Sequence, residues 1–193
     1  MNKMRSCLFG LLLGLSMCQS PVAHAAKYLT SAGPRFGVLY LTDKDTRNKL
    51  SDYAASRKEN ANVSPVLTAF GWQFEYEYLN SGGGSTGLIE FVPLVVGLES
   101  GLVLPSMNMV IGVRFANGFE LGFGPSVSTG VRTDVANAGT PEETTRQKAT
   151  VGVGMTGVVG MTMRVGNMNF PMNLATVRNE NGYRVSLLFG WTL

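Results

Sequence analysis

The stretch VSLLFGWTL, Val185 to Leu193, alternates large apolar side chains with mostly small ones. Successive side chains of an extended strand point to opposite faces. One face of this strand would therefore carry Val185, Leu187, Phe189, Trp191 and Leu193, and the other would carry Ser186, Leu188, Gly190 and Thr192. We interpret the segment as a β-strand with one bulky apolar face and one compact face.

The same period-2 pattern recurs along the chain, and turn-forming residues separate the repeats. Clean alternation covers Phe70–Tyr78, Met107–Phe115, Phe119–Val127, Val151–Met163 and Met168–Ala175. Two further candidates are Arg35–Leu41, which is short, and Gly87–Val96, which is apolar on both faces and contains Pro93. With the last segment the count is eight. An even number lets the first and last strands pair antiparallel, so the sequence predicts an all-β, eight-stranded, antiparallel up-and-down barrel.

Three short turns test this prediction, because the pairing register must place like faces together. A three-residue loop at 116–118, with Gly118 in the left-handed position, pairs Phe115 with Phe119 and Arg114 with Glu120. A two-residue turn at Gly166-Asn167 pairs Val165 with Met168. A four-residue loop at 179–182 pairs Arg178 with Tyr183. All three keep one continuous apolar surface.

The compact face and the loops indicate where the bulky face points. A soluble, lipocalin-like barrel would turn its bulky face inward and its polar face to water. Here the polar face consists of Gly, Ser, Thr and Asn with a few Glu and Arg, and there is no Lys between Val66 and Gly130. Small side chains with sparse charges suit the narrow interior of an eight-stranded barrel. The connections 80–86, 116–118 and 166–167 fall at one end, and the longer ones at 42–66, 97–105 and 132–147 fall at the other, which is typical of outer-membrane barrels. We read 132–147 as an exposed mobile loop.

The alternating strands and the ending at Leu193 give the chain a resemblance to the small eight-stranded outer-membrane barrels, the OmpA/OmpX/OmpW-like group. The resemblance rests on pattern. It implies a transmembrane barrel in the bacterial outer membrane, surrounded by outer-membrane lipid. It also implies that the outer-membrane assembly machinery recognises the C-terminal strand. No functional residue is carried over from the group.

The N-terminal residues predict a cleaved signal peptide, 1–25, followed by a barrel domain, 26–193. Lys3 and Arg5 precede an apolar run from Cys7 to Met17, and Ala23-His24-Ala25 forms a small-x-small cleavage site. Cleavage removes both cysteines and the single histidine. The mature chain would then lack the residues for Cys-His or Ser-His-Asp catalysis and for a Cys/His metal site, so we expect no enzyme activity, no cofactor and no metal. Lys3 and Arg5 also carry two of the three net positive charges, which leaves no electrostatic basis for nucleic-acid binding.

Charged residues on the compact face are the candidate site. Glu75 and Glu77 lie two positions apart, a spacing compatible with paired carboxylates for acid–base work or for cation binding. We favour ion pairs within the lumen instead, because buried charges need partners. The predicted lumen ion-pair residues are Arg35, Glu75, Glu77, Arg114, Glu120 and Arg164, with Glu90 as a further candidate and Arg114–Glu120 as the pair best supported by register.

The first long loop, 42–65, has the pattern of a short helix. Thr42 could cap it with Asp45 three residues on, and Leu50, Tyr53 and Ala54 form a thin apolar stripe. Such a helix would touch partners or cover the barrel mouth; a solvated, partly ordered loop is the interpretation we favour here. For the whole chain we expect a structural or surface-interaction role through the outer loops, with a plugged lumen. Two alternatives stay open: a barrel that binds or passes a small apolar molecule, helped by inward Val110, Val158 and Leu188, and the soluble periplasmic barrel.

Overall fold

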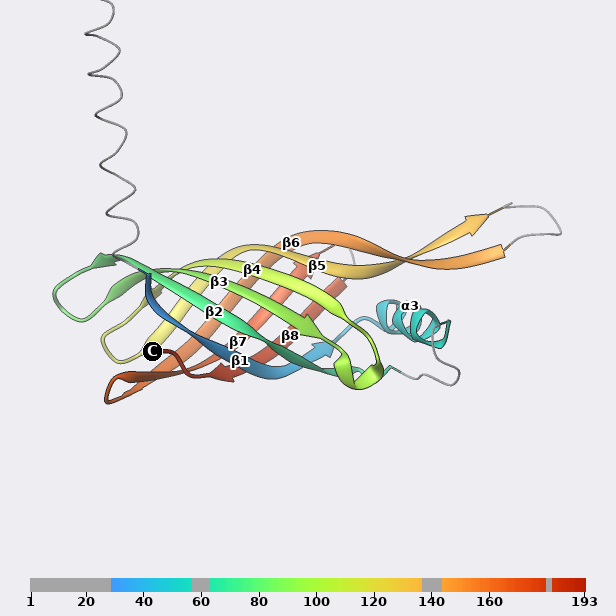
Figure 1. Cartoon of the computed structure of the whole chain (residues 1–193). Coiled ribbons are helices and arrows are strands. Elements are labelled where there is room, and N and C mark those ends of the chain that lie inside the picture. Colours follow the sequence, from blue (N-terminus) through green and yellow to red (C-terminus); the bar gives the residue numbers. More distant parts are fainter. Residues whose placement is uncertain (1–28, 57–62, 137–143, 180–181) are drawn as a thin grey trace, which may run out of the picture.

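A computed structural model describes residues 29–56, 63–136, 144–179 and 182–193 (Figure 1). The predicted signal peptide and its cleavage site lie outside these residues. The strands are β1 (Leu29–Leu41), β2 (Val66–Asn80), β3 (Thr86–Val96), β4 (Leu104–Arg114), β5 (Phe119–Ala136), β6 (Thr144–Val165), β7 (Met168–Asn179) and β8 (Gly182–Gly190). An α-helix, α3 (Lys44–Ala55), follows β1, and a 3-10 helix, η1 (Leu98–Ser100), follows β3.

The eight strands form a closed antiparallel barrel in sequence order, as the alternation predicts. Each strand pairs with its chain neighbours, and β1 closes on β8 with Phe36 opposite Phe189. Closure leaves no free sheet edge along the barrel wall. Beyond Gly190 the chain still pairs: Thr192 bridges to Asn169 of β7, and Leu193 exchanges backbone hydrogen bonds with Ala32 of β1. The C-terminal segment therefore stays within the wall.

The predicted registers at all three short turns are confirmed. Arg114 pairs with Glu120, Val165 with Met168 and Arg178 with Tyr183. The last turn is tighter than predicted, because Asn179 and Gly182 also pair. Gly118 has φ of 85°, and a Cβ built there would lie 2.3 Å from the carbonyl oxygen of Thr162. Both the backbone conformation and the close approach of β6 therefore require glycine at this position.

The bulky face points outward. Phe123, Ile111 and Met161 are 66%, 42% and 50% exposed, and most of the other large apolar residues of this face are exposed as well. A lipocalin-like barrel would bury these side chains at its centre, so the structure contradicts that orientation. The inward positions instead carry smaller, polar or ionic side chains over much of the barrel's length. None of the helices in the described part of the chain has the length and apolar character needed to cross a membrane.

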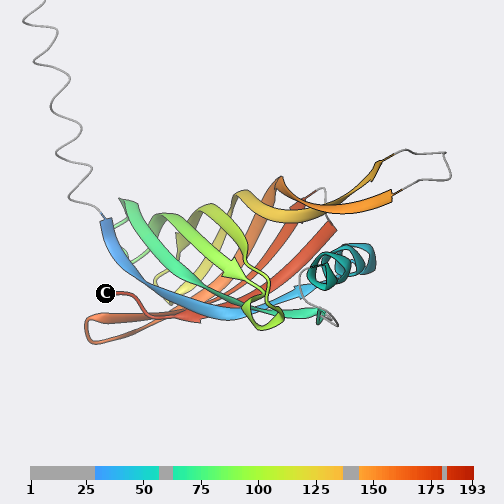
Figure 2. The ribbon, with the colours of Figure 1, turned by 45° about the vertical axis from the view of Figure 1, so that its right-hand side comes forward.

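The barrel's two ends differ (Figures 1 and 2). The tight turns 81–85, 115–118 and 166–167 lie at the end that also holds the C-terminus; α3 and the far parts of β5 and β6 lie at the opposite end. The prediction of a mobile loop at 132–147 was wrong for the described residues. There β5 and β6 continue as a two-stranded ribbon, paired from Thr129–Val151 to Ala136–Thr144, after the contacts of β5 with β4 and of β6 with β7 have ended.

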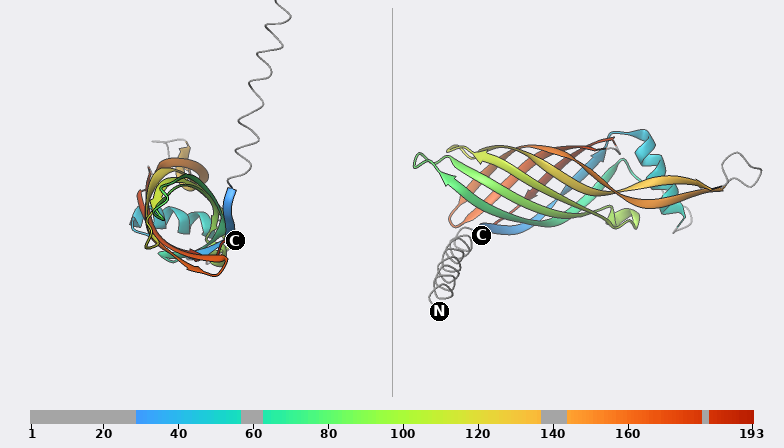
Figure 3. Two further views of the ribbon diagram at one scale, coloured as in Figure 1. Left: turned by 90° about the vertical axis from the view of Figure 1, so that its left-hand side faces the viewer. Right: turned by 90° about the horizontal axis from the view of Figure 1, so that it is seen from above.

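The helix in the first long loop is present, but its cap and its environment differ from our expectation. Asp43, not Thr42, is the N-cap, and its Oδ2 accepts hydrogen bonds from the amide and the hydroxyl of Thr46, at 2.9 and 2.7 Å. These bonds, the hydroxyl first, lower the pKa of Asp43. Leu50 and Ala54 are buried, so the solvated-loop interpretation was wrong. Seen along the barrel axis, α3 lies across the opening (Figure 3, left).

Candidate functional site

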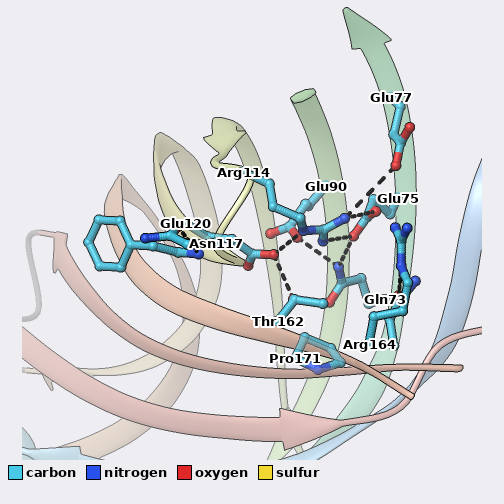
Figure 4. A network of polar contacts seen from close by, with 12 residues as sticks. Gln73, Glu75, Glu77, Glu90, Arg114, Asn117, Glu120, Thr162, Arg164 and Pro171 are labelled. Carbon is cyan, nitrogen blue, oxygen red and sulfur yellow. Dashed lines mark hydrogen bonds and ion pairs between the residues drawn. The ribbon is translucent and has the colours of Figure 1, made fainter. Parts of the chain in front are cut away.

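The lumen holds a network of charged side chains centred on Arg114 (Figure 4). Its NH1 and NH2 groups donate to the two carboxylate oxygens of Glu75, at 2.8 and 2.6 Å. Its Nε donates to Glu120, which also accepts a hydrogen bond from the Thr162 hydroxyl at 2.6 Å. One carboxylate cannot accept from all five N–H donors of a guanidinium. Carboxylates on two sides of the side chain therefore suit a buried arginine. The network joins β2, β4, β5 and β6 across the lumen.

A second branch begins at Arg35, which is 2% exposed. Arg35 donates to the carbonyl oxygen of Pro171 at 2.9 Å and to Oε1 of Gln73. Gln73 passes the network on, since its Nε2 donates to Glu90 at 2.7 Å and to Glu75 at 3.1 Å. The partners of Arg35 in these bonds are neutral groups.

A glycine of the neighbouring strand β8 makes space for Arg35. Gly71 of β2 and Gly190 of β8 lie opposite Arg35 in the two adjacent strands. A Cβ at Gly190 would lie 3.1 Å from Cδ of Arg35. Gly190, which the sequence showed only as part of a small face, thus leaves room for a long cationic side chain.

The structure brings together five of the six predicted residues and separates the sixth. Arg35, Glu75, Arg114 and Glu120 are buried in the network. Glu77 lies at its edge, with Oε1 3.9 Å from NH1 of Arg114 and a side chain that is 26% exposed. Arg164 is exposed, and its Nε donates to Asn169 of the adjacent strand at 3.2 Å. Its position beside the turn at 166–167 explains this, because the side chain is at the rim of the barrel.

Gln73, Thr162 and the Pro171 carbonyl belong to the network but were missed from the sequence. Gln73 could have been found, because it alternates in phase with Glu75 on the same strand face. The carbonyl of Pro171 carries no sequence signal. Glu90, a further candidate, is buried and accepts from Gln73.

Toward the α3 end the lumen becomes apolar. One continuous cluster of buried residues fills it, drawn from the wall, from α3 and from the loops: Leu39, Leu41, Leu50, Ala54, Val63, Leu67, Ala69, Val92, Leu94, Val96, Leu102, Leu104, Val131 and Leu188. The cluster explains why 87–96 is apolar on both faces, since β3 borders hydrophobic surroundings on each side. The sequence analysis placed a few apolar residues, Val110, Val158 and Leu188, on the inward face, and the structure shows that the apolar part of the lumen is much larger.

The lumen is closely packed rather than open. Under α3 the cavity lined by Leu39, Leu50, Leu67 and Leu104 has a volume of about 20 Å³, and the cavity beside Glu90 is equally small. A water molecule needs roughly 10–15 Å³ on this measure, so each cavity has room for about one small guest. No continuous passage follows from cavities of this size.

The described residues offer no grouping of three or more His, Cys, Asp or Glu side chains suited to a metal ion. The side chains that converge in the lumen are guanidiniums, carboxylates, amides and hydroxyls. The bidentate Arg114–Glu75 contact commits that carboxylate to an ion pair rather than to proton transfer. The arrangement can stabilise the closed wall and hold small polar guests.

No protein-family model matches the sequence, and no curated protein matches it. Solved structures that resemble the barrel include two of Ail, the attachment invasion locus protein of Yersinia pestis. The first covers 85% of this chain and 99% of Ail, with 9% identity and a TM-score of 0.48. The second, in complex with the heparin analogue sucrose octasulfate, covers 84% and 98%, with 7% identity and a TM-score of 0.46. These values are too low to carry any property of Ail over to this chain, whose eight-stranded barrel is established by its own strand pairing.

Proposed function

We propose that the chain is a bacterial outer-membrane protein whose barrel crosses the bilayer and whose α3 end faces the exterior. The observation that supports this location is the outward belt of large apolar side chains around a closed barrel with an ionic interior. In hydrocarbon every backbone polar group needs an internal partner, and a closed barrel meets that requirement. The predicted signal peptide, 1–25, would deliver the chain across the inner membrane.

Fractionation tests this location. The protein should stay in the outer-membrane pellet after a carbonate or urea wash, and its gel migration should change on boiling, as a folded membrane barrel does. Mass spectrometry of the mature N-terminus should find Ala26. Recovery of the chain in the soluble periplasmic fraction would contradict the proposal, whereas a different mature N-terminus would contradict only the predicted cleavage site.

We propose a non-enzymatic role, exerted by the elements that extend beyond the barrel at its α3 end. The single observation behind this role is the contrast between a filled lumen and a long exposed ribbon. Arg132 and Asp134 on the ribbon are solvent-exposed, with side chains 77% and 54% exposed. A barrel with a filled lumen and a projecting polar ribbon is suited to contact with molecules or surfaces around it.

A shortened ribbon tests the role. The variant joins Arg132 to Lys148, which are paired, through an Asn-Gly turn and keeps the Val131–Ala149 pair below it. Cells that express the intact protein should adhere to surfaces or autoaggregate more than cells that lack it. Cells that express the variant should lose this gain, while the heat-dependent gel shift persists. Equal behaviour of the two proteins in these assays would contradict a role of the ribbon in surface contact. In planar bilayers the intact protein should give no stable conductance. A robust single-channel current would contradict the proposal that the lumen is plugged.

A second candidate role is the binding of a small apolar molecule beneath α3. The observation that favours it is the aliphatic lining of this half of the lumen, closed on one side by Leu50 and Ala54 of the helix. If α3 moved, this lining would form an apolar pocket. Methyl NMR in lipid nanodiscs tests it: added decanoic acid should shift the inward methyls of Leu50, Leu67 and Leu104. Shifts confined to outward Leu187 would indicate partition into lipid and contradict the pocket.

We further propose that the C-terminal segment, Val185–Leu193, is the part that the outer-membrane assembly machinery recognises. Its outward Leu187, Phe189 and Trp191 are exposed, and its end pairs with β1. Trp191→Ser should slow assembly in cells but leave spontaneous refolding into detergent nearly unchanged. An equal loss in both assays would assign Trp191 to barrel stability alone.

A further inference from the structure

A small chamber lies where the ionic part of the lumen meets the apolar part. It is lined on its polar side by Arg35, Gln73, Glu90, Asn108, Thr156 and Asn173, and on its apolar side by aliphatic residues that include Val110 and Val158. Its volume is about 20 Å³, enough for about one guest the size of a water molecule. The chamber draws on strands from all around the barrel, so it is a feature of the closed fold.

Three side-chain oxygens of this lining lack a hydrogen-bond partner within the described part of the chain. They are Oδ1 of Asn108, Oδ1 of Asn173 and Oγ1 of Thr156. The residues are 8%, 6% and 2% exposed, so bulk water does not reach them freely. A buried polar atom without a partner costs roughly as much as a lost hydrogen bond, and three around one cavity indicate a missing guest.

The charges around the chamber indicate the sign of that guest. Among the described residues, the buried charged side chains of the lumen are the carboxylates of Glu75, Glu90 and Glu120 and the guanidiniums of Arg35 and Arg114, with the partly exposed carboxylate of Glu77 at the edge. Arg114 contacts Glu75, Glu77 and Glu120. Glu90 accepts a hydrogen bond from the neutral amide of Gln73 and forms no ion pair within the described residues. Buried carboxylates in excess of their counter-charges favour a cation.

We propose that the chamber binds a single monovalent cation, coordinated by the Glu90 carboxylate, the two Asn side-chain oxygens and the Thr156 hydroxyl. Hard cations prefer this all-oxygen set. One carboxylate among neutral oxygens supplies too little negative charge for a divalent ion. Arg35 lines the same chamber, but its NH1 and NH2 donate to the Pro171 carbonyl and to Gln73.

Refolding in rubidium chloride followed by diffraction tests the proposal directly. Refolding loads the chamber before it is sealed, and Rb⁺ is close to water in size but scatters anomalously. The expected result is an anomalous peak within the chamber, in contact with Glu90 and with at least two of the three neutral oxygens. Density at that place without anomalous signal, or an empty chamber, would assign the site to water or to no guest and would overturn the proposal.

A matched pair of variants gives a second readout. Glu90→Gln removes the charge at the chamber with little change of shape, and Glu77→Gln removes a carboxylate at the edge of the network. At constant ionic strength, with Rb⁺ exchanged for choline, the folded-to-unfolded ratio of the wild type should rise about tenfold per tenfold Rb⁺ above the dissociation constant. Glu77→Gln should keep this dependence and Glu90→Gln should lose it. A wild type that responds equally to Rb⁺ and choline, or a Glu90→Gln variant that keeps the response, would overturn the proposal.

Discussion

Arg114 and Glu75 lie on β4 and β2, two strands that do not pair with each other, and their side chains meet inside the barrel in a bidentate contact of 2.8 and 2.6 Å. The contact ties together wall segments that backbone hydrogen bonds do not connect. It also leaves both charges almost without solvent, with side-chain exposures of 8% and 2%. Each buried charge is therefore stabilised in the lumen by the opposite charge of its partner.

Replacing Arg114 by Leu should strongly destabilise the barrel. The substitution leaves the buried carboxylates of Glu75 and Glu120 without their shared cation, and breaking a buried ion pair from one side costs about 3–5 kcal/mol. Urea unfolding in lipid vesicles, followed by the gel shift of the folded form, measures the loss. Arg164→Gln is the control, because Arg164 is exposed and should change the free energy of unfolding by about 0.5 kcal/mol or less. Equal effects of the two variants would contradict a structural role for the network.

Phe123→Arg tests which solvent the outer face meets. Phe123 is 66% exposed and lies well inside the part of β5 that pairs on both sides. An arginine facing the middle of a bilayer costs about 2–4 kcal/mol in an outer-membrane barrel. Unfolding in lipid vesicles should show a loss of this size, and Phe123→Leu should show much less. A Phe123→Arg protein as stable as wild type would mean that this face meets water.

Leu50→Ala tests how firmly α3 closes the mouth. Leu50 is 3% exposed within the apolar cluster, and removal of a buried Leu side chain costs about 2–5 kcal/mol. The helix rather than the wall should respond, so hydrogen exchange of the α3 amides should become faster while that of β4 stays slow. Lys49→Ala, at an exposed neighbouring position, serves as the control. Faster exchange in β4 as well would mean that α3 and the barrel unfold together.

The Asp43 cap gives the helix a dependence on pH. The hydrogen bonds from Thr46 lower the pKa of Asp43, so the capping stabilisation is complete above the ordinary Asp value of about 4 and is lost as pH falls through the lower value in the folded state. The Thr46 amide signal in NMR should follow this titration. Asp43→Asn retains an acceptor oxygen and should abolish the pH response, whereas Asp43→Ala should weaken the helix by about 1 kcal/mol at neutral pH. A titration that persists in Asp43→Asn would assign it to another group.

The strands, their number and the inside–outside assignment could be predicted because period-2 alternation and turn length are local properties of the sequence. The Arg114–Glu120 contact followed from one turn. The Arg114–Glu75 contact did not, since it crosses the lumen between residues 39 positions apart. The prediction that Arg164 joins the lumen network was wrong for a similar reason. Alternation shows which face of the strand a residue lies on, but not how far it lies from the barrel's rim.

The division of the lumen into an ionic and an apolar part could not be predicted from the sequence either. Leu39, Leu67 and Leu94 alternate in phase with polar residues of their own strands, so their shared surroundings emerge only when the strands are assembled. The role of α3 depended on the same cluster: a thin stripe of Leu50 and Ala54 is too weak a pattern to distinguish a packed helix from a solvated one until the surface that receives it is known.

The ribbon formed by the far parts of β5 and β6 contributes nothing to closing the cylinder, since the last wall pairs are Ser106–Ser128 and Gly154–Asn179. This projection can therefore be lengthened or shortened without disturbing the closed barrel. Such changes keep the same side chains on the same face of the ribbon only when both strands gain or lose an equal, even number of residues. An insertion of odd length would move the side chains beyond it to the opposite face of the ribbon, while the barrel stayed intact.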